Sequence, residues 1–159
     1  MSVDIKNLTR QHLKVGAGVA FSAIASDVLP GWDISLVFVG PTRARDLNKQ
    51  LRGKEYTPNV LSYALDSTNG EIIICLAEAQ KQAPAYGMNE RQFVLYLFIH
   101  GVLHLKGWAH GATMEQCERK LVAKFVTRTV RPLPNETTHS HRNRHRHVPS
   151  KDGRRRRAR

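Results

Sequence analysis

The sequence has little cysteine and no long apolar segment. Its 159 residues include only two cysteines, Cys75 and Cys117, which make no disulfide framework and which we expect to be free thiols. No apolar run approaches the roughly 18 residues that a membrane-spanning helix needs. The first residues also lack the charged, apolar and small-residue regions of a secretory signal. These absences predict a cytoplasmic protein that does not act at a membrane.

Acidic residues are scarce as well. Asp and Glu number 13 against 25 Lys and Arg, which gives a formal net charge of +12. The excess is densest in residues 135–159, where eight arginines and one lysine occur beside only two acids. We therefore predict a folded domain over residues 1–134, followed by a disordered tail rich in Arg and His. Such a basic chain favours a polyanionic partner, above all nucleic acid, over a role of charge in solubility alone.

The apolar pattern predicts an α+β fold, a small mixed β-sheet packed with helices. Apolar and alternating segments predict strands, of which the one at 33–39 is expected to be central and the one at 59–64 to be an edge or half-buried strand. Helical spacing and cap residues, among them Thr9, Asn89 and Thr113, predict the helices. Strands are expected at 3–5, 33–39, 59–64 and 71–76, and helices at 9–25, from 41 onward, at 77–83, from 89 to a stop at Gly107, and at 113–131.

The most apolar of these helices carries the candidate site. Residues 92–105 contain no Asp, Glu, Lys or Arg, so this helix belongs in the centre of the domain. His100 and His104 lie four residues apart and project from one face, and Gly107 lets the chain turn so that His110 can return as a third ligand. Unpaired buried imidazoles would cost about 1–3 kcal/mol each. We predict a metal centre on these three histidines, with one zinc ion as the cofactor.

The spacing H-x3-H-x2-G-x2-H is also that of the metzincin metallopeptidases, so the helix is metzincin-like and a zinc peptidase is a rival interpretation. Those enzymes place a glutamate directly after the first histidine to act as general base. This chain has Gly101 at that position. Without the carboxylate, peptide hydrolysis is only a lesser alternative.

Three blocks of residues resemble one known family. Residues 97–110 (LFIHGVLHLKGWAH) resemble the HGxLHLxGYDH signature of the YbeY endoribonucleases, the ribosomal RNA maturation factors. Residues 51–54 (LRGK) and 57–63 (TPNVLSY) are similar to the family's RGKD…PTNVLSFP stretch, and residues 69–75 (NGEIIIC) to its LGDIVIC strand. The blocks follow the family's order, and together they are far more specific than the histidines alone.

The resemblance implies a metal-dependent, single-strand-specific endoribonuclease that acts in ribosomal RNA maturation and ribosome quality control. Its partners would be single-stranded RNA, ribosomal RNA and the ribosome or its proteins. The chemistry would be metal-assisted phosphodiester cleavage, because an ion on three neutral histidines keeps its full charge and activates water near neutral pH. Attack by that water and attack by the adjacent ribose 2′-hydroxyl both remain open.

The resemblance also assigns roles to residues outside the histidine cluster. Arg52 matches the family's functional arginine, whose guanidinium can grip a phosphate and stabilise its transition state, so we take it as catalytic. Lys54 of the same motif and Ser62 are taken as substrate-binding residues. Ser62 can equally be only the polar member of an edge strand.

Ala109 is the main departure from the family pattern, which has an aspartate before the third histidine. A carboxylate there can orient a histidine, tune the metal or act as a base, and losses of this kind commonly reduce affinity or activity about 10–100-fold. Ala109 therefore keeps open a second interpretation, a non-catalytic RNA- or ribosome-binding factor with a structural zinc.

Overall fold

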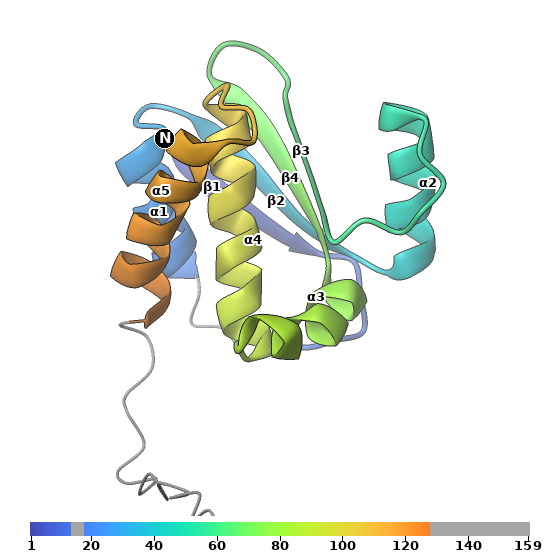
Figure 1. Ribbon diagram of the computed structural model, residues 1–159. Helices are drawn as coiled ribbons and strands as arrows, with labels where there is room; N and C mark the ends of the chain where they lie inside the picture. Colours follow the sequence, from blue (N-terminus) through green and yellow to red (C-terminus); the bar gives the residue numbers. More distant parts are fainter. Residues whose placement is uncertain (14–17, 128–159) are drawn as a thin grey trace, which may run out of the picture.

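The computed structural model of the protein describes residues 1–13 and 18–127. It has one four-stranded sheet with helices on both faces, shown in Figure 1. The strands are β1 (Ser2–Asn7), β2 (Asp33–Val39), β3 (Val60–Ala64) and β4 (Asn69–Cys75). The helices are α1 (Gly18–Val28), α2 (Pro41–Arg52), α3 (Leu76–Gln82), α4 (Glu90–Leu105) and α5 (Ala112–Leu121), with a 3₁₀ turn at Ala83–Tyr86 and a π-helical turn at Val122–Val126.

The sheet is mixed, as the sequence predicted. Its strand order is β1-β2-β4-β3, with β1, β2 and β4 parallel and β3 antiparallel to β4 at the edge. The central position of β2 and the edge position of β3 are both confirmed. Strand β2 is apolar on both faces because alternate residues enter two cores: Leu36 lies in the larger one and Val37 in the smaller one, which α2 covers.

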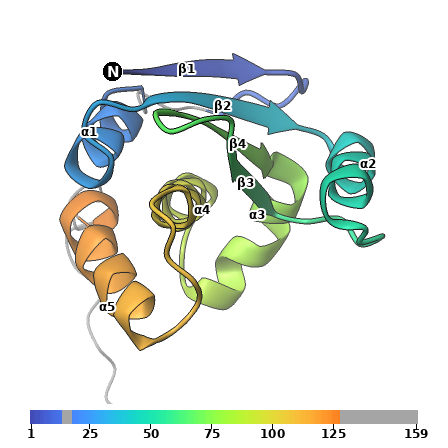
Figure 2. The ribbon, with the colours of Figure 1, turned by 90° about the horizontal axis from the view of Figure 1, so that it is seen from above.

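Helix α4 lies against the sheet, with α1 and α5 beside it (Figure 2). Its predicted start is confirmed: the Asn89 side chain accepts a hydrogen bond from the backbone N–H of Gln92, and the Gln92 side chain accepts one from the backbone N–H of Asn89. Helix and sheet pack closely. If Gly70 of β4 carried a Cβ atom, that atom would lie only 2.7 Å from Leu105 Cδ1. The predicted central helix is therefore held tightly over β4.

Two predicted helix starts are wrong. Thr9 does not cap a helix: its hydroxyl donates to Asn7 Oδ1 in a local turn, which competes with helical backbone bonds. Residues 10–13 are not helical, and the described part of the helix, α1, spans Gly18–Val28. Helix α5 begins at Ala112 with Gly111 as its N-cap, so Thr113 lies inside the first turn.

The described residues include only part of the segment where the last helix was predicted to end, and none of the predicted tail. The α-helical part of this element ends at Leu121 and continues as the π-helical turn. The rest of the helix expected to 131 and the tail at 135–159 lie outside the described residues. Within residues 1–13 and 18–127, no helix is both long and apolar enough to cross a membrane. Cys75 and Cys117 are free thiols, as predicted.

Candidate metal centre

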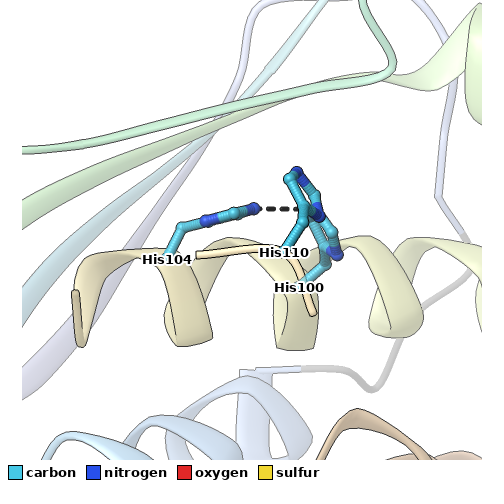
Figure 3. Close-up of side chains that lie close together, drawn as sticks. All are labelled: His100, His104 and His110. Carbon is cyan, nitrogen blue, oxygen red and sulfur yellow. Dashed lines mark hydrogen bonds between the residues drawn. The ribbon is translucent and has the colours of Figure 1, made fainter. Parts of the chain in front are cut away.

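The three predicted histidines meet at the end of α4 (Figure 3). His100 and His104 lie one helical turn apart on the face of α4 that is not buried in the core. The chain leaves the helix after Leu105, turns at Gly107 with φ of +90°, and brings His110 back beside them. One ring nitrogen from each histidine lies within 4.8 Å of the others. This group can hold a metal ion.

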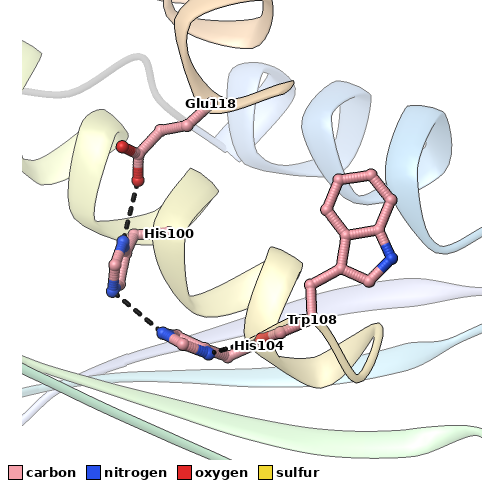
Figure 4. Close-up of polar contacts among 4 residues, drawn as sticks. All are labelled: His100, His104, Trp108 and Glu118. Carbon is pink, nitrogen blue, oxygen red and sulfur yellow. Dashed lines mark hydrogen bonds and ion pairs between the residues drawn. The ribbon is translucent and has the colours of Figure 1, made fainter. Parts of the chain in front are cut away.

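Hydrogen bonds assign the tautomers of the two helix histidines (Figure 4). His104 Nδ1–H donates to the carbonyl oxygen of Trp108 at 2.9 Å, and His100 Nδ1–H donates to the carboxylate of Glu118 at 2.7 Å. In its neutral form, each ring then carries its lone pair on Nε2. These two Nε2 atoms face each other at 3.0 Å. Facing lone pairs repel, whereas a cation between them binds both.

The electrostatic surroundings keep His104 in its metal-binding form. Partial burial, and then the neighbouring His100, lower the pKa of His104 below its ordinary value. A lower pKa favours the neutral ring at neutral pH, and the neutral imidazole is the form that binds a metal. With His110 exposed, the donor set is three imidazole nitrogens with room for a further ligand, which fits zinc.

The histidines line a cleft of about 820 Å³ between α4 and the edge of the sheet. Two other predicted site residues line it as well: Arg52 at the last position of α2 and Ser62 on β3. Lys54 is exposed and is not among the lining residues. The remaining lining residues are Tyr56, Thr57, Pro58, Asn59, Val60, Leu61, Gln82 and Ala109.

Arg52 reaches the cleft because α2 stops sharply. Gly53 adopts φ of +65° and caps the helix, its backbone N–H bonding to carbonyls of the last turn. The following loop is held by Asn48, which is fully buried and donates from Nδ2 to the carbonyl oxygen of Tyr56 at 2.9 Å. The ring of Tyr56 is left 55% exposed at the cleft. Arg52 and Tyr56 therefore lie on the same edge of the cleft, which we call the Arg52 rim.

The position after the first histidine does not face the cleft. A Cβ on Gly101 would lie 3.1 Å from Ile72 Cγ2 of β4, so a larger side chain there would crowd the sheet. A glutamate at this position would point toward Ile72 and would require that side chain to shift by a few tenths of an ångström. The geometry therefore argues against the metallopeptidase interpretation.

Sequence reasoning did not single out Glu118, the carboxylate that holds His100. The signal was present in the helical spacing, because Glu118 lies four residues after Met114 and three before Leu121, and both of these are buried. An acid on the buried stripe of an amphipathic helix needs a partner inside the protein. Tyr96 adjoins it on α4: burial, and then the charge of Glu118, raise the pKa of Tyr96 to about 12, so its hydroxyl stays protonated.

Comparisons with known proteins show which family the chain resembles. Residues 3–128 match the family described as "Endoribonuclease YbeY". The protein of that name from Geobacillus kaustophilus is 34% identical over 121 residues, covering 67% of this chain and 76% of its own. That from a Sulfurihydrogenibium species is 32% identical over 120 residues, with 71% and 77% covered.

A solved structure shares the fold. The solution structure of TM1509 from Thermotoga maritima superposes with a TM-score of 0.59 at 21% sequence identity. It covers 80% of this chain and 91% of that one. The similarity therefore extends over the whole arrangement of sheet and helices.

Proposed function

Because the chain belongs to the YbeY endoribonuclease family, we propose that it is a zinc-dependent endoribonuclease that cuts single-stranded RNA. The observation that carries the proposal is the facing pair of Nε2 atoms, 3.0 Å apart, in a cleft that Arg52 also lines. By its family, its natural targets are ribosomal RNA and the ribosome, in maturation and in quality control. The proposed compartment is the cytoplasm.

The ion is assigned to His100, His104 and His110. When bound, it would supply Lewis-acid chemistry at a phosphate oxygen. Arg52 lies across the cleft as the last residue of α2, and its planar guanidinium suits two oxygens of one phosphate. Its role is to hold the scissile phosphate and to offset the charge that develops in the transition state.

The remaining predicted residues assist binding. The hydroxyl of Ser62 lines the cleft and can hydrogen bond to RNA there. Lys54 is exposed beyond the cleft lining, so its contribution is long-range attraction of phosphates. We propose a nuclease domain at 1–134 and a basic arm at 135–159. Like Lys54, the arm attracts the phosphates of RNA.

The proposal predicts cleavage that depends on both metal and strandedness. Zinc-loaded protein should cut a labelled single-stranded RNA and leave the same sequence intact when it is annealed to its complement, because unstacked bases can enter the cleft. Chelation should stop the reaction and added zinc should restore it. Denaturing gels of the labelled RNA measure both effects.

Ala109 supports a second candidate function, a binding factor that holds RNA without cutting it. Ala109 lines the cleft beside His110, where the family pattern has a carboxylate. If the zinc-loaded protein binds single-stranded RNA but leaves it intact, the nuclease proposal is wrong and the binding factor stands.

The exposed ring of Tyr56 predicts that single-stranded RNA stacks a base at the Arg52 rim. Tyr56→Ala should weaken binding about 10-fold, within the roughly 1–3 kcal/mol that one stacked base contributes. Fluorescence anisotropy with chelated protein measures binding without cleavage. Tyr56→Phe is the matched control for the ring: it keeps the stacking face and removes only the hydroxyl that accepts from Arg52 Nη1 at 3.5 Å, so it should lose far less affinity than the alanine variant. Equal affinity of the alanine variant would remove the stacking role.

A further inference from the structure

Glu118 lies outside the predicted site residues and yet contacts one of them. Its Oε1 atom is 2.7 Å from His100 Nδ1, and its side chain is 14% exposed (Figure 4). It comes from α5, a different element from the α4 helix that carries His100. The two residues are 18 positions apart in the chain, so the contact exists only because α5 packs on α4.

A carboxylate this little exposed needs compensation, because its desolvation costs several kcal/mol when it is unpaired. The His100 Nδ1–H supplies one hydrogen bond. Tyr96, one turn before His100 on α4, lies near this carboxylate, whose charge contributes to the raised pKa of the Tyr96 hydroxyl. The Glu118 carboxylate is thus bonded to Nδ1 of His100, on the opposite side of the ring from Nε2.

The two helix histidines are oriented by acceptors of different strength. The acceptor for His104 Nδ1–H is the neutral carbonyl of Trp108, whereas the acceptor for His100 is a charged carboxylate. A hydrogen bond to a charged acceptor is roughly twice as strong as one between neutral groups. A carboxylate on Nδ1–H also makes the opposite ring nitrogen a better metal donor.

We propose that Glu118 is a positioning residue that locks His100 in the tautomer with Nε2 toward the metal and strengthens it as a ligand. In this chain α5 supplies a carboxylate to the histidine cluster, while position 109, where the family pattern has aspartate, is alanine. The inference rests on the proposed metal site, and its test is independent of RNA cleavage.

The first test measures zinc affinity of the full chain by competition with a chromophoric chelator. Glu118→Ala should bind zinc about 10–100-fold more weakly than the wild type. Glu118→Gln should lose less, because its amide oxygen still accepts from Nδ1–H without the charge. Glu115→Ala is the matched control: it removes the same charge from an exposed position on the same helix and should bind like the wild type.

The second test reads the tautomer directly in metal-free protein. Long-range ¹H–¹⁵N spectra of the imidazoles should show His100 as a single Nδ1–H tautomer in the wild type and as a mixture in Glu118→Ala. His104 should keep its tautomer in both, because its carbonyl partner is unchanged. If Glu118→Ala does not fold, the zinc affinity of Glu118→Gln carries the test, because loss of the charge alone should still weaken zinc binding.

The outcomes separate this inference from the proposed function. Unchanged zinc affinity in both Glu118 variants would overturn it, and so would an unchanged His100 tautomer in Glu118→Ala. If the wild type cuts no RNA but Glu118→Ala still binds zinc more weakly than the wild type, Glu118 is supported as a positioning residue and only the nuclease proposal is refuted. Equal loss in Glu115→Ala would also overturn it, because the effect would then be that of net charge.

Discussion

The His104→Ala variant will cut single-stranded RNA no faster than chelator-treated wild-type protein. His104 contributes one of three nitrogens, and its Nε2 faces His100 at 3.0 Å, so its removal leaves two donors and opens one side of the site. Initial rates on a labelled single strand, with zinc supplied in excess over the protein, measure the effect. Zinc retention after gel filtration should fall with the activity.

The control for this variant is His12→Ala. His12 is an exposed histidine outside the cluster, and replacing it should leave both zinc binding and cleavage unchanged. The His104 ring lies at the cleft and not in the apolar core, so the variant should still fold and show the far-UV spectrum of the wild type. Equal RNA cleavage by wild type and His104→Ala would identify a contaminating nuclease and leave this chain without the proposed activity.

The Arg52→Ala variant will retain zinc but lose about 100- to 1,000-fold in kcat, the usual effect of removing one group that stabilises transition-state charge. Arg52 lines the same cleft as the histidines without belonging to their cluster, so metal affinity should not change. Arg52→Lys should recover only part of the rate, because an ammonium cannot bind two phosphate oxygens in parallel. Single-turnover kinetics separate the cleavage step from binding.

Arg45→Ala is the matched control for Arg52, because Arg45 is an exposed arginine of the same helix that does not line the metal cleft. It removes the same charge from α2, so any general loss of attraction for RNA should appear equally in both variants. A normal kcat in Arg52→Ala, with only KM raised, would show that the guanidinium binds RNA without acting on the transition state.

Most of the strands and helices followed from local pattern. The run at 33–39 is apolar at nearly every position, which predicted the central strand β2, and Asn89 with Gln92 predicted the start of α4 through their paired hydrogen bonds. The failures at Thr9 and Thr113 differ in kind. The Thr9 hydroxyl bonds to Asn7 Oδ1 in a local turn, which no helical spacing reveals, whereas α5 begins at Ala112, one residue before Thr113.

The histidine cluster could be predicted because it is local. His100, His104 and His110 span eleven positions, and helical geometry with one glycine turn is enough to bring them together. Arg52 and Ser62 came from a family resemblance, since nothing in their immediate sequence places them beside a metal site.

The sequence by itself therefore determined the candidate metal-binding group and the elements that carry it, because both depend on periodicities within a few turns of chain. Only the tertiary structure decided which other side chains meet that group. The sheet order sets β3 beside β4, which brings Ser62 to the cleft, and the packing of α5 on α4 brings Glu118 to His100. Such contacts between distant residues arise from burial of apolar faces and leave no spacing in the sequence by which to read them.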